Sequence, residues 1–341
     1  MTTGHRPRGL SAVAQHAGVS VSLASRVLNG DSTLRVRDET RERVVAAARE
    51  LHYVPHGAAR ALRLSRAGAI GLVVHDVSNP IHAGIIRGAQ EAASAAGQVL
   101  LLAEAPELAA NNAVLDQLLG DGRIDGLLWQ GSGFDFDDAL STRAAERLPT
   151  LLVNSRPRAG LPAVRLADED AAGVAVDHLV ALGHRDIGYL GGRAGSDLSD
   201  RRQSGWRTAL QRHGLPVRRK WIVEQDWNSE AGHAAMSKLI SGTQRPTAVF
   251  VANVVVSVGA LAAAREAGVR VPEDLSVIGL HDAWFVAHGS PPLTTVRLPL
   301  QAMGRRAVEL VLSGAKAEPG GHLLSDPPPE LVVRRSTASP G

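Results

Sequence analysis

The hydrophobic residues near the start of the chain recur at the spacing of a helix. Apolar side chains fall every three or four positions, at Leu10, Val13, Ala14 and Ala17. Gly18 follows them and ends the segment, because glycine readily adopts the left-handed conformation of a helix C-cap. Ser20 then stands where a hydroxyl group caps a second helix, which Asn29 and Gly30 close. The pattern predicts two short helices joined by a tight turn, the helix-turn-helix arrangement.

The predicted second helix has one apolar face and one polar face. Its apolar face carries Ala24, Val27 and Leu28, and its polar face carries Ser22, Arg26 and Asn29. It contains no acidic residue, which suits an approach to phosphates. A third helix is expected over residues 38–52, with a buried stripe of Val44, Val45, Ala48 and Leu51. Three such helices close a small core, and the plainer alternative is a helical hairpin inside a larger domain.

From Ala69 onward, short apolar runs alternate with helical stretches. The runs cover residues 69–75, 98–103, 124–129, 150–154, 186–192, 221–224, 247–252 and 275–280. Strands this apolar, separated by helices, predict buried parallel sheets covered on both faces. Two sets of runs predict two lobes. A cleft at the carboxyl ends of their strands is then the expected small-molecule site.

Charge and composition narrow the function. Residues 1–66 carry eleven arginines and five acids, so this segment is formally +6 and the remainder of the +3 chain is −3. A basic first segment on a slightly acidic body is typical of a nucleic-acid-binding head, although a solvated basic terminus is the alternative. The start has no apolar signal segment and no stretch suits a membrane span. We therefore expect a cytoplasmic, nucleoid-associated protein with no membrane partner.

Chemical motifs favour binding over catalysis. The chain has no cysteine, and it lacks the phosphate-binding loop, the dinucleotide fingerprint, the nucleophile elbow and the zinc-protease motif. We expect no enzyme activity, no metal and no cofactor. A solute-binding protein and an enzyme on a doubly wound fold are the competing classes. Residues 1–63 and the missing signal segment argue against the first, and the missing motifs argue against the second.

Several blocks, in order and at normal spacing, carry a family resemblance. They are VAQHAGVSVSLASRVLNG (13–30), TRERVVAAARELHYVP (40–55), AARALR (58–63), IGLVVHDVSNP (70–80), IDGLL (124–128), DHLVALGHRDIGYLGG (177–192), SVIGLHD (276–282) and PPLTTVR (291–297). Together they resemble the LacI/GalR family of transcription regulators. The resemblance implies an N-terminal all-α helix-turn-helix head on an α/β body of two doubly wound, periplasmic-binding-protein-like subdomains.

The resemblance also implies a domain plan. Residues 1–53 form the DNA-binding head, 54–66 a hinge helix and linker, and 67–341 the effector-binding and dimerisation domain. Its N-subdomain covers about 67–167 and 297–325, and its C-subdomain about 168–296 and 326–341. The expected partners are double-stranded DNA with a palindromic operator, a small-molecule effector and a second copy of the chain. The expected activity is that of a regulator, in the first place a repressor, controlled allosterically by the effector.

Candidate DNA contacts follow from the helix faces and from the family. They are Ser20, Val21, Ser22, Ser25, Arg26, Asn29, Ala59 and Leu62. Val21 and Ser22 can meet base edges, and Arg26 can donate two hydrogen bonds to a guanine. Ser25 and Asn29 suit phosphates better. In the hinge, Leu62 matches the family's leucine wedge, with ordinary packing as its alternative.

Candidate effector contacts match family pocket positions at strand ends. They are His75, Asn154, Arg202, Trp227, Asn253, His281 and Asp282. Each has a structural alternative: Trp227 as core, Arg202 paired with an acid, Asn154 as a turn cap. The chain departs from the family at His281 and Val254, which replace acids, and at Ile81–His82, which replace aromatic residues. The expected effector is a sugar or sugar derivative, and these changes favour an acidic or phosphorylated sugar.

Overall fold

The computed structural model describes residues 9–53 apart from 30 and 32, residues 67–131 apart from 121, and residues 135–341 apart from 243. Contacts within the chain form two compact units, Met1–Gly68 and Ala69–Gly341. The hinge segment 54–66, with Ala59 and Leu62, lies outside the described residues. None of the described helices is long and apolar enough to cross a membrane.

In the described residues of the first unit, three helices pack around one small core. They are α1 (Leu10–Ala17), α2 (Val21–Leu28) and α3 (Asp38–Glu50). Gly18 ends α1 at φ 66°, and Ser20 Oγ accepts the Leu23 N–H at 3.2 Å to cap α2, as predicted. The α3 stripe is Val44, Ala47 and Ala48. The prediction of Leu51 as a buried residue was wrong, because α3 ends one residue earlier and leaves Leu51 38% exposed.

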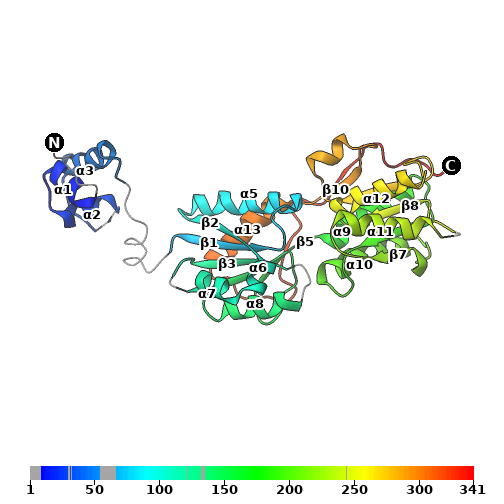
Figure 1. Ribbon diagram of the computed structural model, residues 1–341, viewed down its shortest axis with the longest axis horizontal. Helices are drawn as coiled ribbons and strands as arrows, with labels where there is room; N and C mark the ends of the chain where they lie inside the picture. Colours follow the sequence, from blue (N-terminus) through cyan, green and yellow to red (C-terminus); the bar gives the residue numbers. More distant parts are fainter. Residues whose placement is uncertain are drawn as a thin grey trace. The chain divides into compact units, whose positions relative to one another are not determined.

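The strands described in the second unit form two six-stranded sheets (Figure 1). The first sheet, in the order β11-β5-β4-β3-β1-β2, is parallel, and we call it with its helices the N-lobe. Its strands are β1 (Ala69–Val74), β2 (Val99–Glu104), β3 (Gly126–Gln130), β4 (Thr150–Val153), β5 (Ala163–Leu166) and β11 (His322–Leu324).

The second sheet, with its helices, is the C-lobe. Its order is β12-β10-β9-β8-β6-β7, and only β12, paired with β10, is antiparallel. Its strands are β6 (Ile187–Gly191), β7 (Ile222–Glu224), β8 (Ala248–Val251), β9 (Ser276–Leu280), β10 (Thr294–Arg297) and β12 (Glu330–Val332). The chain passes between the two sheets after β5, after β10 and after β11.

Helices cover both faces of each sheet. In the N-lobe they are α5 (Pro80–Ala95) and α13 (Leu300–Leu312) on one face, and α6 (Ala105–Ala110), α7 (Asn112–Leu119) and α8 (Asp135–Ala145) on the other. In the C-lobe they are α9 (Asp168–Ala181) and α10 (Asp197–Arg212), and then α11 (Ser229–Ile240) and α12 (Val254–Glu266). Alternate residues of each strand supply the two cores, with Leu72 on one face of β1 and Val73 on the other.

One predicted strand is present in the structure but is more exposed than predicted. The run at 98–103 was predicted to be buried, but β2 lies at the edge of its sheet and exposes Val99, Leu101 and Leu102. Its apolar composition predicts burial, but at the edge of the sheet it pairs with a neighbouring strand on one side only. Exposed apolar edge strands are common sites of pairing with another chain.

The close packing of α5 on α13 gives a test of the N-lobe core (Figure 1). A Cβ atom at Gly88 would lie 1.8 Å from the Gln301 carbonyl oxygen. We expect Gly88→Ala to push the helices apart and to lower the free energy of unfolding by about 1–3 kcal/mol in urea titrations. Gly173→Ala in α9 is the matched control, because nothing lies within 4 Å of its added Cβ. It should raise stability by about 0.5–1 kcal/mol, and equal losses at both sites would contradict the packing argument.

Candidate functional site

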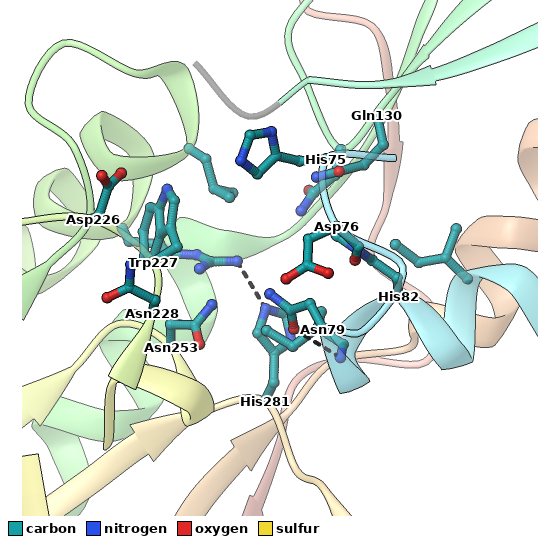
Figure 2. Close-up of a pocket in the computed structure, with 15 residues that line it drawn as sticks. His75, Asp76, Asn79, His82, Gln130, Asp226, Trp227, Asn228, Asn253 and His281 are labelled. Atoms are coloured by element: carbon teal, nitrogen blue, oxygen red, sulfur yellow. Dashed lines mark hydrogen bonds between the residues drawn. The ribbon is translucent and has the colours of Figure 1, made fainter. Parts of the chain in front are cut away.

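A cleft in the second unit collects polar side chains from both sheets. It encloses about 900 Å³ outside the protein atoms, part of it open to solvent. Figure 2 shows Asp226, Trp227 and Asn228 on one side of this space and His75, Asp76 and Gln130 on the other. The lining residues are His75, Asp76, Asn79, Ile81, His82, Ile85, Gln130 and Asn154 from the N-lobe, and Leu198, Arg202, Asp226, Trp227, Asn228, Asn253 and His281 from the C-lobe.

The N-lobe wall is built where β1 ends and α5 begins. Asn79 caps α5, since its Oδ1 accepts the Ile81 N–H at 3.1 Å. His82 Nδ1 lies 2.7 Å from the Asp76 carbonyl oxygen, which can only accept, so Nδ1 carries the proton. Burial lowers the pKa of His82, which is therefore neutral at pH 7. Its Nε2 then has a lone pair and can accept a hydrogen bond.

Helix caps and a glycine position the C-lobe wall. Asn253 Oδ1 accepts the Val255 N–H at 2.7 Å and fixes the start of α12. Trp227, after β7, lies against Gly192, where a Cβ atom would come within 1.9 Å of the indole ring. The Arg202 guanidinium carbon lies 5.3 Å from the centre of the Trp227 ring, within the range of a cation–π contact. The wall therefore offers one aromatic surface among polar groups.

A buried ion cluster holds Arg202 in this wall. Asp168, fully buried at the start of α9, accepts from Arg202 Nε at 2.8 Å and from Arg201 Nη1. Arg201 Nη2 also donates to the Asn154 carbonyl at 3.0 Å, so it joins an N-lobe strand end to the C-lobe. Burial alone would raise the pKa of Asp168, but the two guanidinium groups outweigh it and lower the pKa. The carboxylate thus neutralises charge that the cleft would otherwise offer to a ligand.

His281 has a fixed protonation state. Arg202 Nη2 lies 2.8 Å from His281 Nε2, and a guanidinium group can only donate, so Nε2 accepts and Nδ1 carries the proton (Figure 2). Burial and the nearby Arg202 charge lower the pKa of His281 to about 3. Its Nδ1–H is buried without a hydrogen-bond partner, and its backbone is left-handed at φ 70°. A buried donor without a partner is costly, and a ligand acceptor can satisfy it.

The side chains that line the cleft suit the binding of a small polar molecule. The described residues that line it include no serine, threonine, cysteine, tyrosine or lysine. The described part of the chain also contains no group of three or more His, Asp and Glu side chains that could hold a metal. The amides, the histidines and the indole face are instead the groups that orient a small polar molecule.

The head presents a polar surface on α2. Val21, 45% exposed, and Ser22 stand at its first turn, while Ala24 and Val27 are buried. Asn29 Nδ2 donates to the Ser25 carbonyl at 2.7 Å. This leaves Val21 and Ser22 exposed at the N-terminal end of α2, the part of a recognition helix that contacts base edges.

Comparisons with known proteins agree with both halves of this description. Residues 10–56 match the model for bacterial regulatory proteins of the lacI family, and residues 176–337 match a periplasmic-binding-protein-like domain. The transcriptional repressor PurR of Erwinia tasmaniensis is 33% identical over 330 residues, 96% of each chain, and that of Photobacterium profundum is 32% identical over 327 residues, 95% of this chain and 97% of that one. The chain belongs to the lacI family.

Solved structures of the family have the same fold. The lac repressor dimer bound to operator and the anti-inducer ONPF matches with a TM-score of 0.82 and 30% identity, over 97% of this chain and 99% of that one. A LacI-family regulator from Mycobacterium smegmatis matches with a TM-score of 0.73 and 38% identity, over 80% of this chain and all of that one. The LacI-family assignment and the predicted fold class are therefore confirmed, and the protein is a DNA-binding transcriptional regulator.

The structure of this LacI-family regulator brings together six of the seven predicted effector contacts. They are His75, Asn154, Arg202, Trp227, Asn253 and His281. Asp282 is not among the lining residues. Its carboxylate accepts from Thr295 at 2.9 Å and is ion-paired with Arg297 at 2.7 Å and with Arg334 at 2.8 Å. These contacts place Asp282 beside β10, and its contact with the effector stays a prediction.

Sequence reasoning missed several cleft residues of the LacI-family regulator. Asp76, Asn79 and Gln130 follow predicted strands, so their position was a usable signal. Gly192, directly after β6, was another, because a glycine at a strand end permits close approach of a side chain. Asp168 and Arg201 gave no such signal, because their role depends on pairing between α9 and α10.

The buried cluster of the LacI-family regulator predicts a large effect of one substitution. Asp168→Asn leaves two buried guanidinium groups without their shared anion. We expect it to lower the free energy of unfolding at pH 7 by about 3–5 kcal/mol in urea titrations. Asp177→Asn removes a carboxylate that is 47% exposed and paired with Arg212, and should cost less than about 1 kcal/mol.

The pH dependence of the Asp168→Asn effect has a definite sign. The folded-state pKa of Asp168 is lowered, so the unfolded chain binds its proton more tightly than the folded chain. The stabilisation is complete above the unfolded carboxyl pKa of about 4 and is lost as the pH falls through the folded-state pKa. The difference between Asp168→Asn and the native protein should therefore shrink at acid pH. A small difference, constant with pH, would contradict the cluster.

The tautomer of His281 can be observed directly. In ¹⁵N spectra of histidine-labelled protein, assigned by the loss of signals in His281→Gln, His281 should be a neutral Nδ1–H imidazole throughout pH 5–8. The reason is that Arg202 occupies Nε2 and burial depresses the pKa. The exposed His233 ring, which pairs with Glu266, provides the internal comparison. A neutral Nε2–H form of His281, or its titration in this range, would rule out the assignment.

Proposed function

We propose that this regulator is a homodimeric repressor whose affinity for a palindromic operator is set by a neutral, polyhydroxylated small molecule in the cleft. The main support for this proposal is that residues of both lobes line the cleft. A ligand that bonds to His75 and Asn79 on one side and to Trp227 and Asn253 on the other favours one arrangement of the lobes. A ligand that binds two arrangements unequally shifts their populations, and with them the affinity for DNA.

The charges of the cleft favour a neutral ligand, unlike the anionic sugar expected from the sequence. Asp168 is shared by Arg201 and Arg202, and Asp197 adds a second carboxylate 3.2 Å from Arg201 Nε, so the two acids compensate the two arginines. His281 is uncharged. Asp76 and Asp226 add two carboxyl groups to the lining. The loss of family acids at positions 254 and 281 is thus offset by acids elsewhere. Amide groups and the Trp227 face suit the hydroxyls and the apolar face of a sugar ring.

The apolar edge of β2 supports association with a second copy. Val99 is 60% exposed, and Leu101 and Leu102 are also exposed on this edge strand. The lac repressor neighbour is a dimer bound to operator. A dimer places two heads on one palindrome, which raises operator affinity through the second contact. Because chromosomal operators are in the cytoplasm, we place the protein there, in contact with the nucleoid, as a binding protein without a cofactor or enzymatic activity.

Selection and titration test this function. The purified full-length protein should enrich palindromic duplexes from fragmented genomic DNA over scrambled duplexes of equal composition. Neutral monosaccharides should then change its affinity for the selected duplex by about 5–150-fold, whereas their phosphorylated and uronic acid forms should not. Trp227→Ala should abolish this response while leaving ligand-free operator binding unchanged, and Trp227→Phe should retain it. A response to the anionic forms alone would overturn the proposed effector class.

A further inference from the structure

An acidic residue, Asp31, lies next to the helix that is predicted to contact DNA. Asp31 is the only acidic residue among the first 37, and it lies two residues after the C-terminal cap of α2. The Asp31 N–H donates to the Arg26 carbonyl at 3.1 Å, so the chain turns back directly beneath the helix. A carboxylate there opposes the approach of phosphates and lowers affinity for any duplex.

The Asp31 carboxylate is fixed on both oxygens. Its Oδ1 accepts the Thr33 N–H at 3.0 Å and the Thr33 hydroxyl at 2.7 Å. Its Oδ2 accepts Arg26 Nε at 2.8 Å. The bonds from Thr33 and Arg26 lower the pKa of Asp31, so the group is an anion at pH 7. The Asp31 side chain is 11% exposed and that of Arg26 is 40% exposed. One edge of the Arg26 guanidinium group is therefore bonded to Asp31, while the rest of the group is accessible to solvent.

The bonds use a defined edge of the Arg26 guanidinium. Nε donates to Asp31, and Nη2 lies 3.4 Å from the Thr33 hydroxyl, so both occupied groups belong to the same side edge. The outer edge still carries one N–H from Nη1 and one from Nη2. Two parallel donors of this kind match O6 and N7 of a guanine in the major groove.

We propose that Asp31 is a positioning residue that clamps Arg26 and thereby determines the specificity of one base pair of the operator. The clamp fixes the long arginine side chain before DNA arrives, so less side-chain entropy is lost when the base contact forms. The same charge weakens binding to arbitrary sequence. Both effects raise the ratio of specific to non-specific affinity. This inference deepens the proposed reading of an operator and rests on it.

A comparison of duplex affinities tests the clamp. The wild-type protein first selects its palindrome. If it selects none, the proposed function fails, and the clamp proposal fails with it. With a selected duplex in hand, Asp31→Asn should lower the affinity for it by about fivefold or more, the effect of losing much of one bidentate base contact. Binding to scrambled duplex should stay equal or rise. Duplexes substituted one position at a time should show lost discrimination at one base pair of each half-site.

Two controls separate the clamp from simple charge. Asp38→Asn makes the same change of charge at the start of α3, and no described contact joins Asp38 to Arg26. It should change the affinity for selected and scrambled duplexes by one common factor. In an Arg26→Ala background, Asp31→Asn should have no further effect on discrimination. The clamp is overturned if Asp31→Asn behaves like Asp38→Asn, or if its loss of discrimination persists without Arg26.

A second substitution avoids any damage to the turn that Asp31 supports. Arg26→Lys keeps the positive charge and a donor for Asp31, but lysine lacks the paired outer donors. Circular dichroism melting reports whether each variant head is folded. Arg26→Lys should lose discrimination at the same base pair as Asp31→Asn. If it reads that pair as well as the wild-type protein, Arg26 does not make the bidentate contact and the proposal is wrong.

Discussion

A buried carboxylate between two guanidinium groups determines the chemistry of the cleft. Asp168 orients Arg201 and Arg202, which are adjacent on α10 and extend to different partners. Arg202 in turn fixes the proton on His281 and lies near the Trp227 ring, while Arg201 reaches the strand end at Asn154. Buried ions are stable only when their charges and hydrogen bonds are matched. Asp168 supplies much of that match, and Asp197 and two backbone carbonyls supply the rest.

The cluster also means that Arg202, although it lines the cleft, does not present an uncompensated positive charge to a ligand. Arg202 lines the cleft, but Nε bonds to Asp168, Nη1 to the Ala252 carbonyl at 2.7 Å and Nη2 to His281. Its remaining N–H groups can still bond to a ligand, although its charge is already compensated. A group of this kind orients hydroxyls by geometry. The head uses the same device in a more exposed setting, where Asp31 engages one edge of Arg26 and leaves another.

The features that could be predicted from the sequence are those that depend on neighbouring residues. Helix caps at Gly18 and Ser20 and the eight longer apolar runs reflect local geometry and burial, and the family blocks extend this to the strand-end residues of the cleft. The four strands that were missed, β5, β10, β11 and β12, have three or four residues each, as do the predicted strands β4, β7 and β8. Strands this short show no period, so they were found only where their sequence formed part of an apolar run. The exposure of β2 was missed because an edge position depends on strand order and not on composition.

Pairings between distant residues could not be read from the chain. Asp168 precedes Arg202 by 34 residues, and nothing local marks it as the partner. Asp282 follows a strand just as His281 does, yet it is paired with Arg297 and Arg334 instead of facing the cleft. The expected charge of the ligand depends on the same long-range placement. Counting the acids lost at family positions overlooks acids that the fold brings in from elsewhere.

The three passages of the chain between the two sheets have a consequence for how such regulators diversify. Each lobe is assembled from separate stretches of the sequence, with β11 and β12 contributed by the last part of the chain. A genetic recombination with one breakpoint near Gly68 transfers an intact head to another body, but no single breakpoint transfers an intact lobe. One such event can thus pair an existing operator preference with a different ligand preference, whereas the two walls of the cleft cannot be exchanged separately by a single breakpoint.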